Sequence, residues 1–445
     1  MKNILLFGAG RSSSSLIRYL LDNAVKYNWH LTVGDASQDL AILRTGNHPR
    51  SRAVAIRVED DVLRKKFIGE ADIVISLLPP ALHYIVALDC LQLKKNMVTA
   101  SYVSPELRAL HGEVEKSGLT FLNEMGLDPG IDHMSAMKTI NEIRAAGGNL
   151  ISFKSYCGGL PASESNDNPW GYKFTWNPRN VVMAGRGTAC YIEDSGYRYV
   201  PYNRLFLETE EVKVNGCGTF EAYANRDSLS YRGQYGLQHI PTMRRGTLRM
   251  PGFCRAWNVF VKLGWTDDSF IIQDSGQMTW ASFLEAFLPN SSPGVTLEKR
   301  LSDFAGEDED SDVMLKMKWL DIYSDEKTAV PSASPASLLQ NMLEKKWVFK
   351  ESDRDMIVMQ HEFVYMLGKE RISIVSSLVS GGENAVHTAM SRTVGLPLGI
   401  GAKLLLENRI GLKGVIIPVS KEIYTPVLEE LKYFGIVFSE KKSSA

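Results

Sequence analysis

The sequence predicts an α/β protein in which a parallel-sheet domain is followed by a second α/β domain with a mixed sheet and a helical insertion. Three observations lead to this prediction. The chain opens with an apolar run, a Gly-x-Gly turn and a helical pattern, and strand-like and helix-like patterns then alternate up to residue 130. Beyond residue 150, long strand-like runs flank a stretch of helical patterns. Regular alternation of strands and helices is typical of a parallel sheet with helices on both faces.

The first element is expected to be a strand that leads into a phosphate-binding turn. Residues 4–7 (ILLF) are apolar, as in a strand buried on both faces, and Gly8 and Gly10 follow at once. In a Rossmann-type domain the first glycine allows a tight turn, and the second lets a pyrophosphate approach the backbone. Ser13 replaces the third glycine of the usual pattern. The turn predicts a dinucleotide site, and a tight turn without a ligand is the alternative. The cofactor-binding residues expected in this turn are Gly8, Gly10, Arg11, Ser12 and Ser13.

The second strand, residues 30–35 (HLTVGD), ends in an acid, Asp35. A carboxylate at this position accepts hydrogen bonds from both hydroxyls of the adenine ribose. A 2′-phosphate would face it directly, and two unit charges ~4 Å apart at an effective dielectric near 20 repel by about 4 kcal/mol. We therefore expect NAD as the cofactor. NADP remains the alternative, because Arg11 and Arg44 could offset the repulsion.

Later strands of the parallel sheet are predicted at 52–58, 71–79, 96–102 and 119–126, with a helix over 83–94. Ligands bind where such strands end, so the residues after each apolar run are candidates for function. These residues are Leu78, Pro79 and Pro80, then Ser101 and Tyr102, then Glu124 and Asp128. Each could instead be ordinary packing or a turn cap.

The end of this region, LDPGIDH (127–133), predicts a turn followed by a helix that stops at Gly147 and Gly148. Asp132 is expected to be the N-cap of that helix. We expect no metal site at Asp128, Asp132 and His133, because three side chains on a turn and a helix start rarely converge.

The second sheet is expected to contain strands at 150–160, 255–264, 355–366 and 371–379. Helical patterns at 280–288 and 334–343 lie between the second and third of these strands. Two dense stretches stand out, 156–179 and 223–253, and the first has no period of its own. The second contains five arginines, which would suit a substrate with several carboxylates or would simply be solvated. They are Arg226, Arg232, Arg244, Arg245 and Arg249.

Composition narrows the class of protein. The chain is 44% hydrophobic and 23% charged with a net charge of −1, which is ordinary for a globular protein and gives no reason to expect a nucleic-acid or membrane partner. Its five cysteines are scattered without a C-x-x-C pair, as expected for free thiols in a reducing compartment. No signal peptide or membrane-length segment is recognisable. We expect a cytoplasmic enzyme without a bound metal.

Five long motifs carry a resemblance to a known family. They are SYVSPEL (101–107), NEMGLDPGIDH (123–133), SYCGGLPASESNDNPWGYKFTWNPR (155–179), RGTLRMPGF (245–253) and SRTVGLPLGIGAKLLLENRI (391–410). Together they closely resemble the glutamate-forming saccharopine dehydrogenases, also called saccharopine reductases, over nearly the whole chain. The resemblance implies an oxidoreductase of lysine metabolism. Such an enzyme interconverts saccharopine with L-glutamate and 2-aminoadipate 6-semialdehyde by hydride transfer to a nicotinamide cofactor.

The resemblance also implies a homodimer of three-part subunits. Residues 1–130 would form the Rossmann-type domain, completed by 386–445. Residues 131–265 and 355–385 would form the domain that binds substrate and dimerises, and 266–354 would be the helical insertion. The substrate contacts implied are Ser101, Tyr102, Asp128, Arg226, Thr247, Leu248 and Arg249.

The chemistry of this reaction requires a group that takes a proton from the substrate amine. Asp128 is the first choice, and Tyr102 and Cys157 are secondary acid–base candidates. The chain departs from the family at two places. Its turn reads GAGRSSS where fungal members resemble Gly-Ser-Gly-Phe-Val, and Asp35 stands where NADP-using fungal members carry an arginine. In this it is more similar to the NAD-using dehydrogenase half of the bifunctional lysine-degrading enzymes.

Two other functions stay open from sequence alone. A carboxynorspermidine-type dehydrogenase would run the same chemistry on a polyamine precursor, but a cationic substrate would favour acids over the arginines of 223–253. A non-catalytic dinucleotide-binding scaffold would keep the fold without turnover. The direction of the reaction in the cell is not decided by the sequence either.

Overall fold

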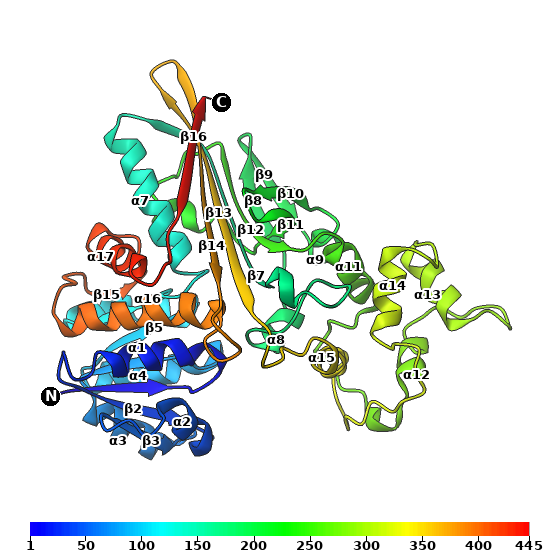
Figure 1. Cartoon of the computed structure of the whole chain (residues 1–445), viewed down its shortest axis with the longest axis horizontal. Helices are drawn as coiled ribbons and strands as arrows, with labels where there is room; N and C mark the ends of the chain where they lie inside the picture. The colour runs from blue at the N-terminus through cyan, green and yellow to red at the C-terminus, as the bar shows by residue number, and fades with distance from the viewer. Residues whose placement is uncertain (445) are drawn as a thin grey trace.

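The computed structural model describes residues 1–444, which form two β-sheets and a separate group of helices (Figure 1). The first sheet has seven strands, all parallel, in the order β15-β6-β5-β4-β1-β2-β3. The strands are β1 (Lys2–Phe7), β2 (Trp29–Asp35), β3 (Ser51–Ala55), β4 (Ile73–Ser76), β5 (Asn96–Thr99), β6 (Thr120–Leu122) and β15 (Gly414–Ile416). The strand order reverses beside β1, and this arrangement confirms the predicted Rossmann-type sheet.

Helices cover both faces of this sheet. They are η1 (Arg11–Ser13), α1 (Ser14–Asp22), α2 (Gln38–Thr45), α3 (Asp61–Glu70), η2 (Pro80–Leu82), α4 (His83–Gln92), α5 (Pro105–Ala109), α6 (His111–Lys116) and, from the C-terminal part, α16 (Ala389–Leu406) and α17 (Lys421–Lys432). Strand β1 is buried on both sides: Ile4 and Leu6 belong to one hydrophobic cluster, and Leu5 and Phe7 belong to another. The apolar run at 4–7 therefore serves as a central strand.

Glycines of α16 allow this helix to lie directly against α1. A Cβ at Gly395 would lie 2.7 Å from the backbone nitrogen of Leu16, and one at Gly399 would lie 2.6 Å from the ring of Tyr19. Such contacts leave no room for a side chain, so the C-terminal helix forms part of the packing around the first sheet.

The second sheet has nine strands in the order β10-β11-β12-β7-β13-β14-β16, and β8 and β9 join it beside β12. Its strands are β7 (Asn149–Pro161), β8 (Ala189–Glu193), β9 (Gly196–Val200), β10 (Glu210–Val214), β11 (Gly218–Ala224), β12 (Thr242–Arg249), β13 (Asp355–Leu367), β14 (Glu370–Gly381) and β16 (Ser439–Ser444). Strands β7 and β12 are parallel and the other neighbours are antiparallel, which confirms a mixed sheet.

Several short helices and α7 connect or flank the strands of this second sheet. They are α7 (Ile131–Ala145), η3 (Ser163–Ser165), α8 (Pro178–Val182), α9 (Tyr202–Leu205), α10 (Tyr231–Gln234) and α11 (Phe253–Leu263). The prediction of a strand at 255–264 is wrong, because this segment forms α11. Phe253, Trp257 and Phe260 are buried at helical spacing, and the alternation of Trp257, Val259 and Val261 imitated a strand.

The predicted helical segment is present between α11 and β13. It contains η4 (Ser275–Gln277), α12 (Trp280–Glu285), α13 (Leu297–Ala305), α14 (Asp312–Trp319) and α15 (Pro335–Lys346), and it projects to one side of the second sheet (Figure 1). Buried aromatic side chains join it to the segment around α11; for example, the ring of Trp265, two residues after α11, stacks on Phe283 of α12 at a centroid distance of 4.5 Å.

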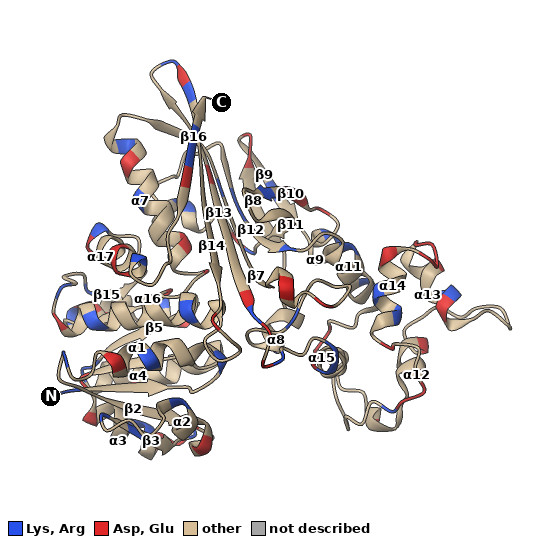
Figure 2. Ribbon diagram, in the orientation of Figure 1, with Lys and Arg blue, Asp and Glu red and all other residues tan. Residues whose placement is uncertain are grey.

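The C-terminal segment contributes to both sheets. Strand β15 forms the edge of the first sheet, whereas β16 pairs with β14 of the second. The domain division given above remains a prediction, and Ala445, the last residue of its 386–445 segment, lies outside the described residues. Within residues 1–444 no helix is long and apolar enough to span a membrane. Acidic and basic residues are interspersed along the ribbon (Figure 2).

Candidate active site

The turn after β1 has the shape that a dinucleotide pyrophosphate needs. Gly8 has a φ of +102°, and a Cβ there would lie 2.7 Å from the carbonyl oxygen of Leu77. At Gly10 a Cβ would meet no atom within 4 Å, so the backbone borders open space. Leu78 and Pro79 follow the neighbouring strand β4. The turn thus fits a dinucleotide, with the N-terminus of α1 behind it to attract an anion.

The serines of the turn bond to the protein itself. The Ser13 hydroxyl donates to the Gly10 carbonyl at 2.8 Å, and the Ser14 hydroxyl donates to the Val386 carbonyl at 2.5 Å. Ser15 shares a 2.8 Å hydrogen bond with Ser391 of α16. Ser13 therefore shapes the turn, while Arg11 is exposed and Ser12 is half-buried beside the open space.

Asp35 lies at the end of β2, as predicted. Its Oδ2 accepts the Ala9 N–H at 2.8 Å and its Oδ1 accepts the Ser37 N–H at 2.9 Å, which fixes the carboxylate beside the glycine turn. Arg44 is close by, with its Nε 3.4 Å from the Ala9 carbonyl oxygen. Burial and the neighbouring charge of Arg11 lower the pKa of Arg44. One acid, Asp35, and two cations, Arg11 and Arg44, therefore lie at the same end of the turn.

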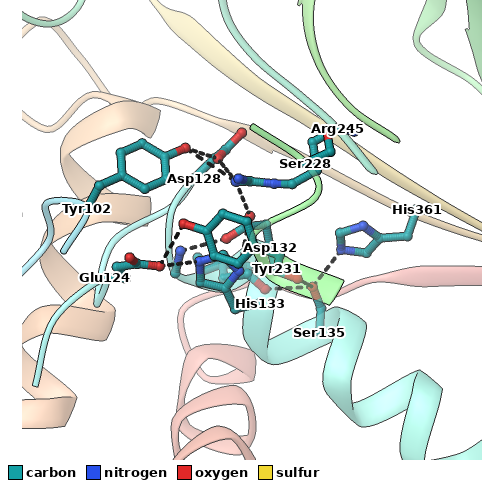
Figure 3. Close-up of polar contacts among 12 residues, drawn as sticks. Tyr102, Glu124, Asp128, Asp132, His133, Ser135, Ser228, Tyr231, Arg245 and His361 are labelled. Carbon is teal, nitrogen blue, oxygen red and sulfur yellow. Dashed lines mark hydrogen bonds and ion pairs between the residues drawn. The ribbon is translucent and has the colours of Figure 1, made fainter. Parts of the chain in front are cut away.

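A buried polar cluster lies where the carboxyl ends of β5 and β6 face β12 (Figure 3). The Tyr102 hydroxyl donates to Asp128 Oδ1 at 2.9 Å. Arg245 of β12 donates from Nη2 to Asp128 Oδ1 at 2.5 Å and to Asp132 Oδ2 at 2.8 Å. The structure therefore brings Tyr102 and Asp128 together, as the strand-end rule predicted, and adds a guanidinium that joins two carboxylates.

The prediction that Asp132 caps α7 is wrong. Gly130 is the N-cap residue, with a φ of +147° and no side-chain capping bond. Asp132 lies inside the first turn, and its carboxylate accepts the Gly130 N–H at 2.6 Å. The N-cap of α7 thus lies two residues earlier than predicted. Gly130 can occupy this position because glycine adopts the backbone conformation without strain.

The two aspartates have opposite pKa shifts. Burial raises the pKa of Asp128 and the like charge of Asp132 raises it further, while Arg245 acts against both. Burial also disfavours the charge of Asp132, but His133, Arg245 and the Gly130 N–H outweigh burial and lower the pKa of Asp132. Burial likewise raises the pKa of the Tyr102 phenol. Asp128 is therefore the carboxyl group of the pair that takes up a proton more readily.

Glu124 supports this cluster from within the protein. Its Oε2 is 2.8 Å from His133 Nε2 and accepts the Tyr231 hydroxyl at 3.1 Å, and its Oε1 accepts the Val103 N–H at 3.0 Å. Glu124 is 2% exposed, so its carboxylate has no access to a ligand. His133 also bonds Tyr235 through Nδ1 at 2.5 Å. Of the described residues, no group of three or more His, Cys, Asp or Glu side chains is arranged to hold a metal ion.

Cys157 and Thr247 lie opposite each other on neighbouring parallel strands β7 and β12. Cys157 is buried, and its burial raises the pKa of the thiol well above the ordinary value, with Asp128 adding to the shift. The group is therefore a neutral thiol at neutral pH. Leu248, the residue after Thr247, is fully buried and belongs to the aromatic core of the second sheet.

The five arginines of 223–253 divide into two groups. Arg245 pairs with aspartates, Arg244 pairs with Glu210 at 3.1 Å, and Arg232 bonds Tyr197 and the Gln238 carbonyl. Arg226 and Arg249 have no carboxylate within 4.0 Å among residues 1–444. Arg226 is exposed, with its guanidinium 5.6 Å from the centre of the Tyr102 ring.

Arg249 is only 4% exposed, and it lies among the rings of Tyr172, Tyr223 and Phe253 at 5.1–5.6 Å. Its Nη1 donates to the Leu248 carbonyl at 2.8 Å and its Nη2 lies 3.4 Å from the Tyr223 hydroxyl, whereas its Nε has no hydrogen-bond partner within the described chain. A desolvated guanidinium without a counter-ion is unfavourable by several kcal/mol, so this environment suits an anionic ligand.

Sequence reasoning missed the role of Arg245 as the bridge between Asp128 and Asp132. The segment TMRRGTLR (242–249) forms β12, a strand that is absent from the set predicted above. A period of two along this strand places Arg245, Thr247 and Arg249 on one side and Arg244 on the other. That alternation was the available signal.

Two family models cover most of the chain. The model described as "Saccharopine dehydrogenase NADP binding domain" matches residues 4–122, and "Saccharopine dehydrogenase C-terminal domain" matches residues 126–436. The L-glutamate-forming, NADP(+) saccharopine dehydrogenase of Saccharomyces cerevisiae is 36% identical over 99% of both chains. The chain belongs to the saccharopine dehydrogenase family.

Other members of the family and a structural relative extend this result. The mitochondrial alpha-aminoadipic semialdehyde synthase of Bos taurus is 36% identical, and the match spans 99% of this chain but 48% of the bovine protein. The apo structure of saccharopine dehydrogenase (L-Glu forming) from S. cerevisiae has a TM-score of 0.89 at 34% identity and is covered completely. A homospermidine synthase from Legionella pneumophila, at 10% identity and a TM-score of 0.58, shares the fold alone.

Proposed function

We propose that this protein is an oxidoreductase that interconverts saccharopine with L-glutamate and 2-aminoadipate 6-semialdehyde, using a nicotinamide dinucleotide. Its relatives have this activity in their names, and the dinucleotide turn and the residues Tyr102 and Asp128 follow the carboxyl ends of strands in the same parallel sheet. The observation that carries the proposal is the position of two arginines without a carboxylate partner: Arg226 lies beside the Tyr102 ring, and Arg249 is buried among aromatic rings. Saccharopine has three carboxylates that would complete them.

The carboxylates of the substrate explain the environment of Arg249. Each charge-assisted hydrogen bond to a carboxylate contributes about 1.5–3 kcal/mol. We propose that Arg226 and Arg249 each hold a substrate carboxylate, with Ser101 and Thr247 completing the substrate site. Leu248 can contribute through its backbone alone, because its side chain is fully buried in the aromatic core.

Asp128 is the proposed proton acceptor. The secondary amine of saccharopine has to be neutral before hydride leaves the neighbouring lysine-side carbon, because the nitrogen lone pair forms the new C=N bond. Burial raises the pKa of Asp128 and brings it closer to the range in which a carboxylate acts as a general base. Water then adds to the imine, and the carbinolamine collapses to L-glutamate and the semialdehyde.

Tyr102 and Cys157 are proposed as the secondary acid–base groups. Both are protonated at neutral pH, since burial raises both pKa values. The Tyr102 hydroxyl donates to Asp128 and thereby orients the carboxylate. Cys157 would serve as a proton donor rather than as a thiolate, because its pKa lies well above neutrality.

A bound nicotinamide dinucleotide supplies the hydride acceptor. We propose that the residues of the turn hold its pyrophosphate and that Asp35 holds the adenine ribose, with Leu78 and Pro79 bordering the nicotinamide side. The residues proposed for the turn are Gly8, Gly10, Arg11, Ser12 and Ser13. The carboxylate of Asp35 is fixed by two backbone N–H groups, so it cannot easily turn away from a 2′-phosphate. This favours NAD, whereas Arg44 and Arg11 would allow NADP.

The choice of cofactor is tested by Asp35→Asn. Removing the charge should lower the ratio of kcat/KM with NAD to kcat/KM with NADP by at least about tenfold, since a repulsion of a few kcal/mol is lost. Asp39→Asn, an exposed acid in the first turn of α2, is the control and should leave the ratio unchanged. A ratio that does not move in Asp35→Asn would remove Asp35 from cofactor selection.

The substrate is tested by Arg249→Met, which keeps the length of the side chain without the charge. We expect KM for saccharopine to rise about tenfold to a hundredfold, because one charge-assisted bond is lost. Arg232→Met is the control, because the Arg232 guanidinium lies over the Tyr197 ring and not among the rings that surround Arg249. Faster turnover of a carboxynorspermidine-type substrate would support the polyamine reaction instead, and cofactor binding without any turnover would support the non-catalytic scaffold.

We also propose, from the family resemblance, that the protein is a homodimer of the cytoplasm. Sedimentation of the purified full chain at several concentrations measures the mass of the particle. A mass of one chain at all concentrations would contradict the dimer.

A further inference from the structure

His83 lies between two serine hydroxyls at the carboxyl ends of neighbouring strands. It is the first residue of α4 and is 1% exposed. Its Nδ1 is 2.8 Å from the hydroxyl of Ser76, the last residue of β4. Its Nε2 is 2.7 Å from the hydroxyl of Ser101, which follows β5. The imidazole therefore connects a completely buried hydroxyl with one at the proposed substrate site.

The backbone of Ser101 is fixed on both sides. Its N–H donates to the Thr99 hydroxyl at 3.3 Å, and its carbonyl accepts the Glu124 N–H at 3.2 Å. The next residue, Tyr102, donates to Asp128. With the backbone fixed, the Ser101 hydroxyl can still rotate about its side chain, and the bond to His83 restricts this rotation.

His83 is uncharged at neutral pH, because burial lowers its pKa to about 4. A neutral imidazole has one N–H donor and one acceptor nitrogen, so the hydrogen bonds that link Ser76, His83 and Ser101 run in one direction. The Ser76 hydroxyl is 0% exposed and contacts only His83 through its side chain among the described residues. A buried O–H needs an acceptor, and Nδ1 is the acceptor within reach. The ring proton then lies on Nε2 and is donated to Ser101.

The weaker contact of Thr99 does not change this direction. The Thr99 hydroxyl is 3.4 Å from Nε2, long for a hydrogen bond between a hydroxyl and a ring nitrogen. With the proton on Nε2, each of the two short bonds has one donor and one acceptor. The buried Thr99 hydroxyl then has no side-chain acceptor, but its 3.4 Å contact is much longer than the 2.8 Å bond to Ser76, so the shorter bond sets the direction. The opposite arrangement would leave the Ser76 proton buried without an acceptor and would turn the Ser101 proton inward.

We propose that Ser76 and His83 make Ser101 a fixed hydrogen-bond donor toward an anionic group of the substrate, so that His83 is a positioning residue for substrate binding. The oxygen of Ser101 is occupied by the His83 N–H, and its own proton is free to point into the site. Because a carboxylate only accepts hydrogen bonds, a committed donor matches it. This inference deepens the proposed function and rests on it, since it assigns Ser101 to a substrate carboxylate.

The test compares His83→Leu, His83→Gln, Ser76→Ala and Ser101→Ala in steady-state saccharopine oxidation by the full-length protein. We expect KM for saccharopine to rise about tenfold to a hundredfold in His83→Leu and Ser101→Ala, while kcat and KM for the dinucleotide change less than about threefold. His83→Gln should recover part of the loss, because its amide nitrogen can still donate to Ser101. Ser76→Ala should also raise KM, since the imidazole loses the donor that sets its direction.

The double variant His83→Leu/Ser101→Ala shows whether the two residues act together. We expect it to match Ser101→Ala alone, because His83 acts only through the Ser101 hydroxyl. The inference would be overturned if the increases in KM of the two single variants multiply in the double variant, or if His83→Leu leaves KM unchanged. In either case, saccharopine turnover by the unmodified protein would still uphold the proposed function. Absence of turnover in the unmodified protein would overturn both.

A second measurement reads the protonated ring nitrogen directly in the unmodified protein. Nitrogen NMR of the unmodified protein, labelled in its eight histidines, reports which ring nitrogen carries the proton. The His83 signal, assigned by its loss in His83→Gln, should show protonated Nε2 and unprotonated Nδ1 near neutral pH. A proton on Nδ1 would contradict the direction assigned to the chain.

Discussion

Asp128 and Asp132 share the Nη2 of Arg245, yet their surroundings differ. Asp132 is 2% exposed and also accepts a backbone N–H, whereas the side chain of Asp128 is 15% exposed and bonds Tyr102. The fixed negative charge of Asp132 therefore acts on a neighbour that can exchange protons with a ligand. Two carboxylates with pKa values pushed apart commonly have different roles in a site.

This arrangement predicts a pH effect of Asp132→Asn. The groups facing Asp128 are Tyr102, Asp132, His133, Cys157 and Arg245. The like charge of Asp132 raises the pKa of Asp128, so its removal lowers that pKa. The acid limb of the kcat/KM profile, which reports ionisation of the base, should then move to lower pH.

Asp128→Asn provides the reference for that experiment. It should lower kcat by about a hundredfold or more, because general-base catalysis contributes on the order of 10²–10⁴ in rate. It should also abolish the acid limb. An acid limb that shifts upward in Asp132→Asn, or that persists in Asp128→Asn, would contradict the assignment of Asp128 as the base.

At the residue scale the sequence predicted Tyr102 and Asp128, because both follow strands whose ends meet at one edge of the sheet. It did not predict that Glu124 and His133 are buried partners of each other. Their contact depends on the fold of a turn in which Glu124 itself has a φ of +58°. No spacing along the chain reports such a local conformation.

At the scale of elements, the packing of α16 on α1 brings the C-terminal segment close to the glycine turn that follows β1. Gly395 lies against the backbone of Leu16, two residues after the start of α1. Ser14 and Ser15 bond to Val386 and Ser391 at the same place. The position of the helix N-terminus at the proposed pyrophosphate site therefore depends on a contact between the N-terminal and C-terminal parts of the chain.

Gly395→Ala should destabilise the protein by about 1–3 kcal/mol, since the added methyl group would overlap with backbone and cannot be accommodated by a rotamer change. Gly112→Ala is the matched control, because Gly112 lies in the short helix α6 and a Cβ there would meet nothing within 4 Å. Urea unfolding of both variants measures the difference. Equal stability of the two would show that α16 moves away from α1 at little cost.

Element types were predictable where one period dominated the segment. Strands β7, β13 and β14 and helices α4, α7 and α15 lie where the sequence predicted them. The error at α11 came from a helix that is buried on most sides, so that its apolar residues fit either period. Strands β8 to β11 were not predicted, because they are short and their turns interrupt any alternation.

At the scale of the molecule, the two sheets meet at the proposed site. Arg11 on the phosphate turn donates to the carbonyl of Phe174, which belongs to the region of the second sheet, at 3.0 Å. Asp128 and Tyr102 come from the first sheet, and Arg245 comes from the second. The geometry of the proposed site therefore depends on how both sheets are held. The helical insertion α12 to α15 contributes no residue to this cluster.

The central claim is that these parts together oxidise saccharopine. The most direct measurement mixes the purified protein with saccharopine and NAD or NADP, and follows both the reduced nicotinamide and the L-glutamate that is formed. We predict one L-glutamate for each reduced nicotinamide, with faster turnover with NAD. Absence of nicotinamide reduction with both cofactors, or reduction without release of L-glutamate, would contradict the claim.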